Sequence, residues 1–275
     1  MKHIRIISPS GVIEPEYIIL ATQRLERWGF RVSIGQHAFD ACGRFAGTAE
    51  NRLSDLNEAF SDPSVDIILC SRGGYGMQHL VDKIILPSRP KSEWPLVVGF
   101  SDITVLHALM SLHGVPSLHA SMCKALATLP DDSAALLMLQ DALKSGKINN
   151  LPALEGRKVI GGNLSLLYAL QGTPYSLDAI IDHCEQPPVL LLEDIGERHY
   201  HIDRMLHNLR LSGVLSRLDG VIVGQFTDCE DDPLMSCSIQ ETIAELFAEY
   251  DYPIIWDAPY GHVDENHPIF LSLKI

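Results

Sequence analysis

The feature that most constrains the fold is a regular alternation of apolar, strand-like segments with amphipathic, helix-like segments in the first half of the chain. Residues 65–70 (VDIILC) and 95–99 (PLVVG) are almost continuously apolar, which is typical of strands buried on both faces. Residues 15–30 and 48–62 have apolar positions at helical spacing, and Thr48 is placed to cap the second helix. This alternation predicts an α/β fold with an open, mostly parallel sheet flanked by helices.

The length of the chain and a change in its pattern predict two domains. A chain of 275 residues is long for a single core. We expect an N-terminal α/β domain over residues 1–130, a helix and an irregular connector over 131–156, and a smaller C-terminal α/β domain over 157–275. Strand-like segments continue in the last of these, at 187–197 and 218–226.

Composition and charge argue against several classes of partner. Apolar residues make up 46% of the chain, yet no apolar stretch approaches the roughly 18 residues of a membrane-spanning helix. The formal net charge is −14 and there is no basic run, so we expect no nucleic acid partner. The N-terminus lacks the features of a signal peptide, and the six cysteines form no CxxC pair. We therefore expect a cytoplasmic protein with reduced thiols.

Ser101 follows the second buried strand directly, in the sequence GFSD. Functional side chains of parallel sheets gather at the carboxyl ends of strands. Ser101 is therefore either the N-cap of the helix that follows or a nucleophile at the N-terminus of that helix. In the second case the N–H of Asp102 is a candidate oxyanion donor.

A glycine-rich segment, SRGGYG at residues 71–76, follows the other buried strand. Its three glycines allow a close approach of the backbone to a ligand, and its N–H groups could bind an oxyanion or a phosphate. It matches neither the dinucleotide-binding nor the P-loop pattern. A tight turn that only requires glycine remains the alternative.

A nucleophilic serine needs a base and an acid that orients the base. Among the twelve histidines, His262 stands out because it lies in a loop, PYGH, after a strand-like segment. Glu193 ends a buried apolar strand and is a candidate acid, although it could instead be an acid at a helix N-terminus. His199 and His201 have no third ligand at a suitable spacing, so we expect no metal site.

Taken together, these segments resemble the LD-carboxypeptidase family of serine peptidases (peptidase family S66, muramoyltetrapeptide carboxypeptidases). The similarity runs in family order over nearly the whole chain. It is carried by SPSG (8–11), AGTAENRLSDLNEAFSDPSVDIILCSRGGYG (46–76), VVGFSDITVLH (97–107), IGGNLSLLYALQGTPY (160–175), LLLEDIGERHYHIDRMLHNLRLSG (190–213) and PYGH (259–262). The resemblance implies an N-terminal open α/β domain, a smaller C-terminal domain and an active site at the seam between them.

The resemblance also implies roles for individual residues. Ser101 would cap the helix that follows and also be the nucleophile, Glu193 the orienting acid and His262 the general base, with backbone N–H groups of Asp102 and Gly74 forming the oxyanion hole. Members of the family remove the C-terminal D-alanine from muropeptide tetrapeptides in the bacterial cytoplasm, where this serves cell-wall recycling. They use no metal or organic cofactor, and a homodimer is implied.

Four further residues bear on substrate binding or on the choice of the acid. Arg72, beside the glycine segment, is a candidate for binding the free carboxylate of the substrate, although a structural salt bridge would explain it equally well. Glu197 is a rival to Glu193 as the acid. His199 and His201 stand where the family has proline- and arginine-rich sequence, and the chain ends earlier than the family pattern. These departures bear on the identity of the substrate rather than on the triad.

Three other functions are alternatives to that of an LD-carboxypeptidase. A relative within the family cleaves peptidyl-nucleotide antibiotics and confers self-immunity, but it would need an aromatic surface for the base, and the three tryptophans lie in core-like segments. A non-catalytic muropeptide-binding protein would lack a member of the triad. A glutaminase would need a cysteine at position 101, whereas Cys70 precedes the glycine segment.

Overall fold

The strands of the first half form a six-stranded sheet. The computed structural model describes residues 1–147 and 156–272. The strand order in this sheet is β10-β5-β4-β3-β1-β2, and every pair is parallel except β10 with β5. The strands are β1 (His3–Ile7), β2 (Arg31–Ile34), β3 (Ile67–Cys70), β4 (Leu96–Gly99), β5 (Ser117–His119) and β10 (Ile269–Leu271).

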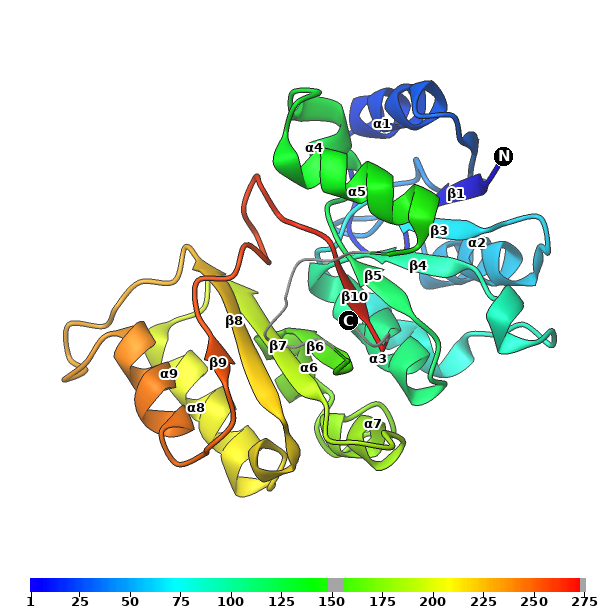
Figure 1. The fold of residues 1–275 in the computed structure, drawn as a ribbon. Coiled ribbons are helices and arrows are strands. Elements are labelled where there is room, and N and C mark those ends of the chain that lie inside the picture. The colour runs from blue at the N-terminus through cyan, green and yellow to red at the C-terminus, as the bar shows by residue number, and fades with distance from the viewer. Residues whose placement is uncertain (148–155, 273–275) are drawn as a thin grey trace.

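Helices cover both faces of this sheet, as continuously apolar strands require (Figure 1). One face packs against α1 (Pro15–Arg27), α4 (Cys123–Thr128) and α5 (Ala134–Ser145). The other packs against α2 (Ala49–Ser61) and α3 (Thr104–Leu112). Along β3, for example, Ile67 and Leu69 face the first group, whereas Ile68 and Cys70 face the second.

The local signals that predicted these elements are present in the structure. Thr48 caps α2, because its side chain accepts a hydrogen bond from Asn51 N at 3.2 Å. Pro15 occupies the first turn of α1, where its missing N–H costs nothing. The chain also forms short 3-10 helices at Met77–His79, Val81–Lys83, Lys91–Glu93, Ser101–Ile103 and Leu215–Arg217.

A second, four-stranded parallel sheet forms the other lobe, in the order β6-β7-β8-β9. Its strands are β6 (Val159–Asn163), β7 (Val189–Ile195), β8 (Gly220–Thr227) and β9 (Ile254–Ile255). One face is covered by α6 (Leu164–Ala169), α7 (Leu177–Asp182), α8 (His199–Leu211) and α9 (Ile239–Phe247). The other face packs against the C-terminal segment through Ala258, Tyr260, Ile269 and Leu271. The predicted fold class is confirmed.

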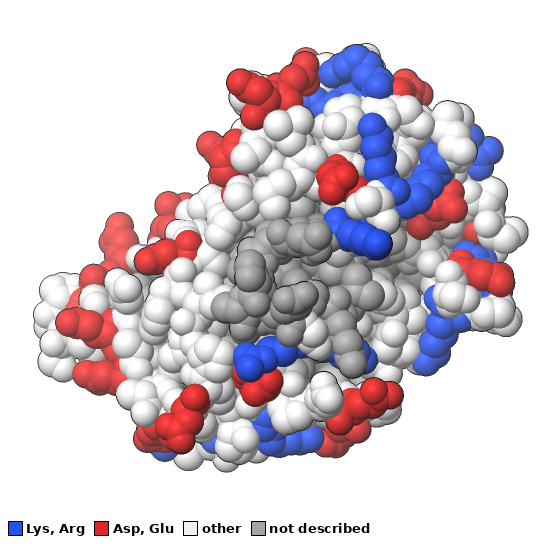
Figure 2. Space-filling model, viewed as in Figure 1, with Lys and Arg blue, Asp and Glu red and all other residues white. Residues whose placement is uncertain are grey.

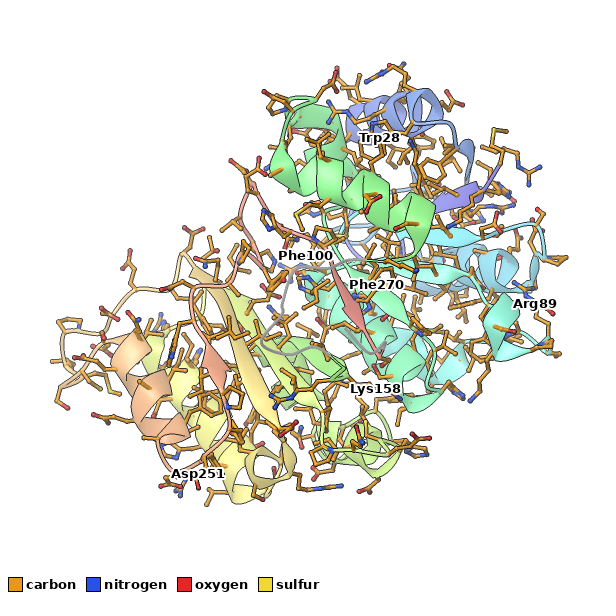
Figure 3. The ribbon with its side chains drawn as sticks, viewed as in Figure 1. Trp28, Arg89, Phe100, Lys158, Asp251 and Phe270 are labelled. Carbon is orange, nitrogen blue, oxygen red and sulfur yellow. The ribbon has the colours of Figure 1, made fainter. Side chains whose placement is uncertain are left out.

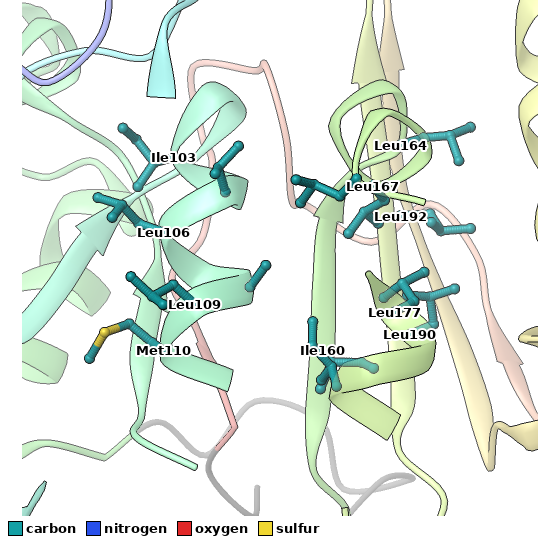
Figure 4. Packing of buried hydrophobic residues seen from close by; sticks show 14 of the residues in the cluster. Ile103, Leu106, Leu109, Met110, Ile160, Leu164, Leu167, Leu177, Leu190 and Leu192 are labelled. Carbon is teal, nitrogen blue, oxygen red and sulfur yellow. The ribbon is translucent and has the colours of Figure 1, made fainter. Parts of the chain in front are cut away.

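The two lobes share one hydrophobic core around α3. Leu106 and Leu109 of α3 belong to the same buried cluster as Ile160 and Leu190 of the second sheet, and Figure 4 shows the two sets facing each other. The approach is close: a Cβ at Gly162 would lie 2.6 Å from the hydroxyl of Thr104, the first residue of α3. The helix that follows Ser101 is therefore packed directly against the second lobe.

The chain does not divide as simply as the expected domains suggest. Within the expected C-terminal domain, residues 157–275, strand β10 leaves the second lobe and pairs antiparallel with β5 of the first sheet. Of the expected segment 131–156, the structure describes a helix at Ala134–Ser145, while residues 148–155 lie outside the described residues. No helix within the described residues is long and apolar enough to cross a membrane.

Candidate active site

Ser101 lies in a sharp turn between β4 and α3. Its backbone has φ of +65°, which costs a non-glycine residue about 1–2 kcal/mol. The preceding Phe100 is extended, with φ of −155° and ψ of −172°. Such a strained strand-to-helix turn raises a side chain above the end of the sheet, as in nucleophile elbows. Ser101 is partly exposed there.

The interpretation of Ser101 as a helix cap is wrong. The 3-10 turn Ser101–Ile103 precedes α3, and neither has a side-chain hydrogen bond at its N-terminus. Residues with positive φ are not in the extended conformation that an N-cap adopts. The hydroxyl of Ser101 is thus not engaged in capping.

The glycine segment 71–76 lies against Ser101. A Cβ at Gly73 would be 2.7 Å from Cβ of Ser101 and 2.9 Å from its hydroxyl oxygen, so only glycine permits this contact. Gly11 N donates to the carbonyl of Gly73 at 3.0 Å and holds the segment from the other side. Gly74 is exposed with φ of +110°, and its N–H has no hydrogen-bond partner in the described residues.

Two buried charged side chains, Asp102 in the turn and Arg52 on α2, hold the end of the glycine segment. The carboxylate of Asp102 accepts a hydrogen bond from Met77 N at 3.0 Å, and burial raises the pKa of that carboxyl. Arg52, only 2% exposed on α2, donates to the carbonyls of Pro9 and Gly76 at 2.6 and 3.2 Å. No sequence motif singled out Arg52. A charged residue on the buried face of a predicted helix was the available signal.

Glu193 and His262 form a hydrogen-bonded pair from the second lobe. His262 Nδ1 lies 2.8 Å from Oε2 of Glu193, whose side chain is fully buried on β7. The pairing of β7 with β8 is irregular between Leu192 and Asp194, which re-aims the side chain at this point. The alternative of a helix N-terminal acid is wrong, because Glu193 lies within a strand.

Gly261 allows the loop that carries His262 to lie close to Glu193. A Cβ at Gly261 would lie 3.0 Å from both Cβ and Oε2 of Glu193, and φ of Gly261 is +125°. Asn266, which sequence reasoning missed, fixes the same loop: Gly261 N donates to Asn266 Oδ1 at 3.0 Å. Ser121 Oγ in turn donates to the carbonyl of Asn266 at 3.2 Å, which anchors the loop to the first lobe.

The pair meets the turn at Ser101 through Phe100. The rings of Phe100 and His262 have centroids 4.8 Å apart in an edge-on arrangement. Phe100 lies at the boundary between the two lobes (Figure 3). The ring of His262 therefore lies against the residue that precedes Ser101, so the Glu193–His262 pair of one lobe lies close to the turn at Ser101 in the other.

The neighbouring carboxyls Glu193 and Asp194 have opposite pKa shifts. Burial raises the pKa of Glu193, but the nearby imidazole of His119 and the hydrogen bond with His262 offset this, and the pKa lies below its ordinary value. Burial and the adjacent Glu193 raise the pKa of Asp194 to about 7, although Asn163 Nδ2 and Ser165 N donate to it at 2.8 and 2.9 Å. Of the two, Glu193 is the one that stays ionised near neutral pH.

The raised pKa of Asp194 predicts a pH dependence of stability. Between its ordinary value of 3.8 and about 7, the folded protein holds a proton that the unfolded chain has lost. This contribution is therefore fully present below pH 4 and falls, by up to about 4 kcal/mol, as the pH rises to 7. In urea unfolding at pH 5 to 8, we expect Asp194→Asn to remove this fall. Asp251→Asn, at an exposed position, is the control. Equal slopes for Asp194→Asn and the wild type would contradict the assignment.

The other candidate residues have separate positions. Glu197, the rival acid, pairs with His201 at 2.9 Å on the first turn of α8. His199 is buried and contacts the hydroxyl of Thr242 at 2.7 Å, so His199 and His201 have different partners. Arg72 is exposed, and its Nη1 donates to the carbonyl of Val12 at 2.6 Å. The described residues contain no ion pair of Arg72.

Cys70 is not exposed as a cysteine nucleophile would be. Cys70 is fully buried, and burial raises the pKa of its thiol. No group of three or more His, Cys, Asp or Glu side chains in residues 1–147 and 156–272 could hold a metal ion.

The face shown in Figure 2 has acidic side chains along the rim of the lobe that contains α8 and α9, whereas basic and acidic side chains are mixed over the other lobe.

A two-lobed α/β protein with its candidate site at the junction of the lobes is thus defined. The model described as the LD-carboxypeptidase N-terminal domain matches residues 4–120, and that of the LD-carboxypeptidase C-terminal domain matches residues 155–275. The chain belongs to the LD-carboxypeptidase family, a family of peptidases. The resemblance found in the sequence is confirmed.

Individual proteins show the same relationship. The chain is 30% identical to the murein tetrapeptide carboxypeptidase of Pseudomonas aeruginosa, over 96% of this chain and 89% of the relative. Its fold is similar to that of the muramoyltetrapeptide carboxypeptidase from Oxalobacter formigenes, with a TM-score of 0.82 and 25% identity, over 98% and 92% of the two chains. It also shares its fold with MccF in complex with glutamyl sulfamoyl guanosine, with a TM-score of 0.81 and 16% identity, over 98% and 91%.

Proposed function

We propose that the protein is a serine-type LD-carboxypeptidase that removes the C-terminal D-alanine from murein tetrapeptides. The observation that carries this proposal is the hydrogen-bonded pair Glu193–His262, which lies beside the strained turn that presents Ser101. The names of the relatives from Pseudomonas aeruginosa and Oxalobacter formigenes support the substrate class.

The proposed reaction uses each group in turn. His262 Nδ1 carries a proton toward the Glu193 carboxylate, which leaves Nε2 free to accept the proton of Ser101 as its oxygen attacks the peptide carbonyl. The same imidazole then gives that proton to the nitrogen of the leaving D-alanine. Water, activated by His262, finally hydrolyses the acyl-enzyme and restores the hydroxyl of Ser101.

The oxyanion formed in each step would be bound by backbone donors. Asp102 N is in the first turn after Ser101, where N–H groups have no acceptor within the helix. Gly74 N has no partner in the described residues, and the neighbouring Gly73 contacts Ser101. Removal of one such donor typically costs about 3–4 kcal/mol of transition-state stabilisation.

Arg72 is the proposed partner of the carboxylate at the end of the substrate. It stands beside the glycines of the segment, and among the described residues only its Nη1 is engaged, by a backbone carbonyl. A guanidinium can bind a carboxylate with two parallel hydrogen bonds. On a chain with a net charge of −14, a local cation of this kind is needed to hold an anionic substrate.

The proposal is tested with the purified tetrapeptide L-Ala-γ-D-Glu-meso-diaminopimelate-D-Ala. We expect the protein to release free D-alanine and to leave the same peptide ending in L-alanine intact. Binding of the tetrapeptide without release would instead support a non-catalytic muropeptide-binding protein. The absence of both binding and release would contradict the proposed substrate.

A peptidyl-nucleotide is the second candidate substrate, because exposed aromatic side chains lie at the glycine segment. Tyr75, 43% exposed and adjacent to Gly74, packs with Phe45 and His79 at ring distances of 5.7 and 5.2 Å. An aromatic surface of this kind could stack a base. The tryptophans are only half-buried and pack partly against the cores. Cleavage of an aminoacyl sulfamoyl nucleoside in preference to the tetrapeptide would favour this candidate.

The setting of the reaction forms part of the same proposal. Hydrolysis of a tetrapeptide by these residues needs no metal or organic cofactor. We propose that it serves the recycling of cell-wall peptides in the bacterial cytoplasm and that the protein acts as a homodimer.

The contact between Gly73 and Ser101 leads to a prediction about the rate. We expect Gly73→Ala to lower D-alanine release at least 100-fold, because the new Cβ would displace the turn that holds Ser101. Gly43→Ala is the control: Gly43 is exposed with φ of +61°, and a Cβ added there would meet no atom within 4 Å. It should lose about 1 kcal/mol of stability and no activity. A wild-type rate for Gly73→Ala would show that the contact is unimportant.

A further inference from the structure

His119 is a fully buried histidine with no hydrogen-bond partner in the described residues. It is the last residue of β5, and both of its ring nitrogens lack a partner. Its Nε2 lies 4.0 Å from Oε1 of Glu193, the carboxylate oxygen that His262 does not contact. That oxygen also lacks a hydrogen-bond partner. Buried polar atoms that remain unpaired are costly, so two that face each other call for an explanation.

The neighbours of His119 do not provide that partner. Its ring lies against Phe100 and His107, with centroids 5.6 and 6.3 Å apart. His107 is already engaged: Nε2 contacts the carbonyl of Gly99 at 2.8 Å and Nδ1 contacts Ser117 Oγ at 2.9 Å. A carbonyl can only accept, so Nε2 of His107 carries the proton. Burial lowers the pKa of His107 to about 3, which keeps this ring neutral.

We propose that His119 is a positioning residue that holds the catalytic acid from the opposite lobe. In this arrangement the Nε2–H of His119 is directed at Oε1 of Glu193 while His262 occupies Oε2, so that the carboxylate lies between two imidazoles. His119 comes from the first sheet, next to the strand that leads to Ser101, whereas Glu193 and His262 come from the second lobe. The inference rests on the proposed role of Glu193 as the acid.

This arrangement has a consequence for proton binding. The titratable groups around Glu193 are His262 and His119, with Asp194 next to it on the same strand and His107 behind His119. A donor directed at the carboxylate lowers the proton affinity of the Glu193–His262 pair, whichever of the two binds the proton. Loss of that donor therefore moves the acidic limb of the pH–rate profile to higher pH.

The test compares two variants in D-alanine release from the tetrapeptide. His119→Leu removes the donor; we expect kcat to fall about 10- to 100-fold, as for other residues that orient a catalytic ligand or base, with KM little changed. Its acidic limb should move upward by at least half a pH unit. His119→Gln keeps an N–H donor and should recover most of both properties. His3→Leu, at a buried histidine at the other end of the same sheet, should leave the profile in place.

A second measurement does not depend on activity or on the His119 variants. In wild-type protein with ¹⁵N-labelled histidine, we expect the Nε2 resonance of His119 to report a protonated nitrogen at neutral pH and to shift in Glu193→Gln. An unprotonated Nε2, or an unchanged pH profile in a folded His119→Leu, would overturn the inference. If the wild type releases no D-alanine, the proposed function fails, while the resonance of His119 still decides whether it is directed at Glu193.

Discussion

Ser101→Ala is expected to abolish release of D-alanine from the tetrapeptide while leaving the fold intact. In serine peptidases, loss of the nucleophile lowers kcat by about 10⁶-fold, and we expect at least 10⁴-fold here. Alanine and serine tolerate the φ of +65° at this position equally badly, so the free energy of unfolding should change little. The measurement is the rate of D-alanine release, with tetrapeptide affinity measured in parallel.

The control for this substitution uses the backbone strain itself. Ser101→Gly removes the same hydroxyl but relieves the positive φ, so we expect an equally inactive protein that is more stable by about 1 kcal/mol. Urea unfolding of the two variants measures the difference. If Ser101→Ala kept a rate within tenfold of the wild type, the nucleophile would lie elsewhere.

Glu193→Gln should be the second most damaging change, with a loss in kcat of about 10⁴-fold. The glutamine amide keeps the volume of the side chain but can present an N–H to His262 Nδ1, where the carboxylate now accepts at 2.8 Å. Nδ1 would then have to accept, which places the proton on Nε2, and the imidazole could no longer take a proton from Ser101. The corresponding substitution in trypsin-like enzymes has an effect of this size for the same reason.

Glu197→Gln is the matched comparison, because Glu197 is four residues away and also contacts a histidine. Its partner is His201 on α8, and its own side chain is about one-quarter exposed. We expect this variant to release D-alanine within about threefold of the wild-type rate. If Glu197→Gln lost activity and Glu193→Gln kept it, the roles of the two carboxylates would be reversed.

Much of the fold could be predicted because the relevant signals are local. The apolar runs at 65–70 and 95–99 indicate strands buried on both faces, and these are β3 and β4. Thr48 indicated the start of α2 correctly. The position of Ser101 at the end of β4 followed from the same pattern. Its conformation did not, since a serine before a helix usually signals a cap rather than a positive φ.

What could not be predicted depends on contacts between distant segments. Nothing near Glu193 in the sequence says that His262 rather than His201 will reach it; the irregular pairing of β7 with β8 and the close approach at Gly261 decide this. Asn266 and His119 resemble ordinary polar residues until the fold buries them beside the pair. Their roles could be assigned only from the three-dimensional arrangement.

The return of β10 to the first sheet has a consequence for synthesis of the chain. Strand β5 has β4 on one side, and its other edge pairs with Ile269–Leu271 of β10. While the ribosome is still adding the intervening residues, the lobe that contains Ser101 has an open strand edge, and such edges promote association with other chains. The loop with His262 immediately precedes β10. The edge is therefore closed only after the segments with Glu193 and His262 have been synthesised, so the first sheet can be completed only when most of the second lobe already exists.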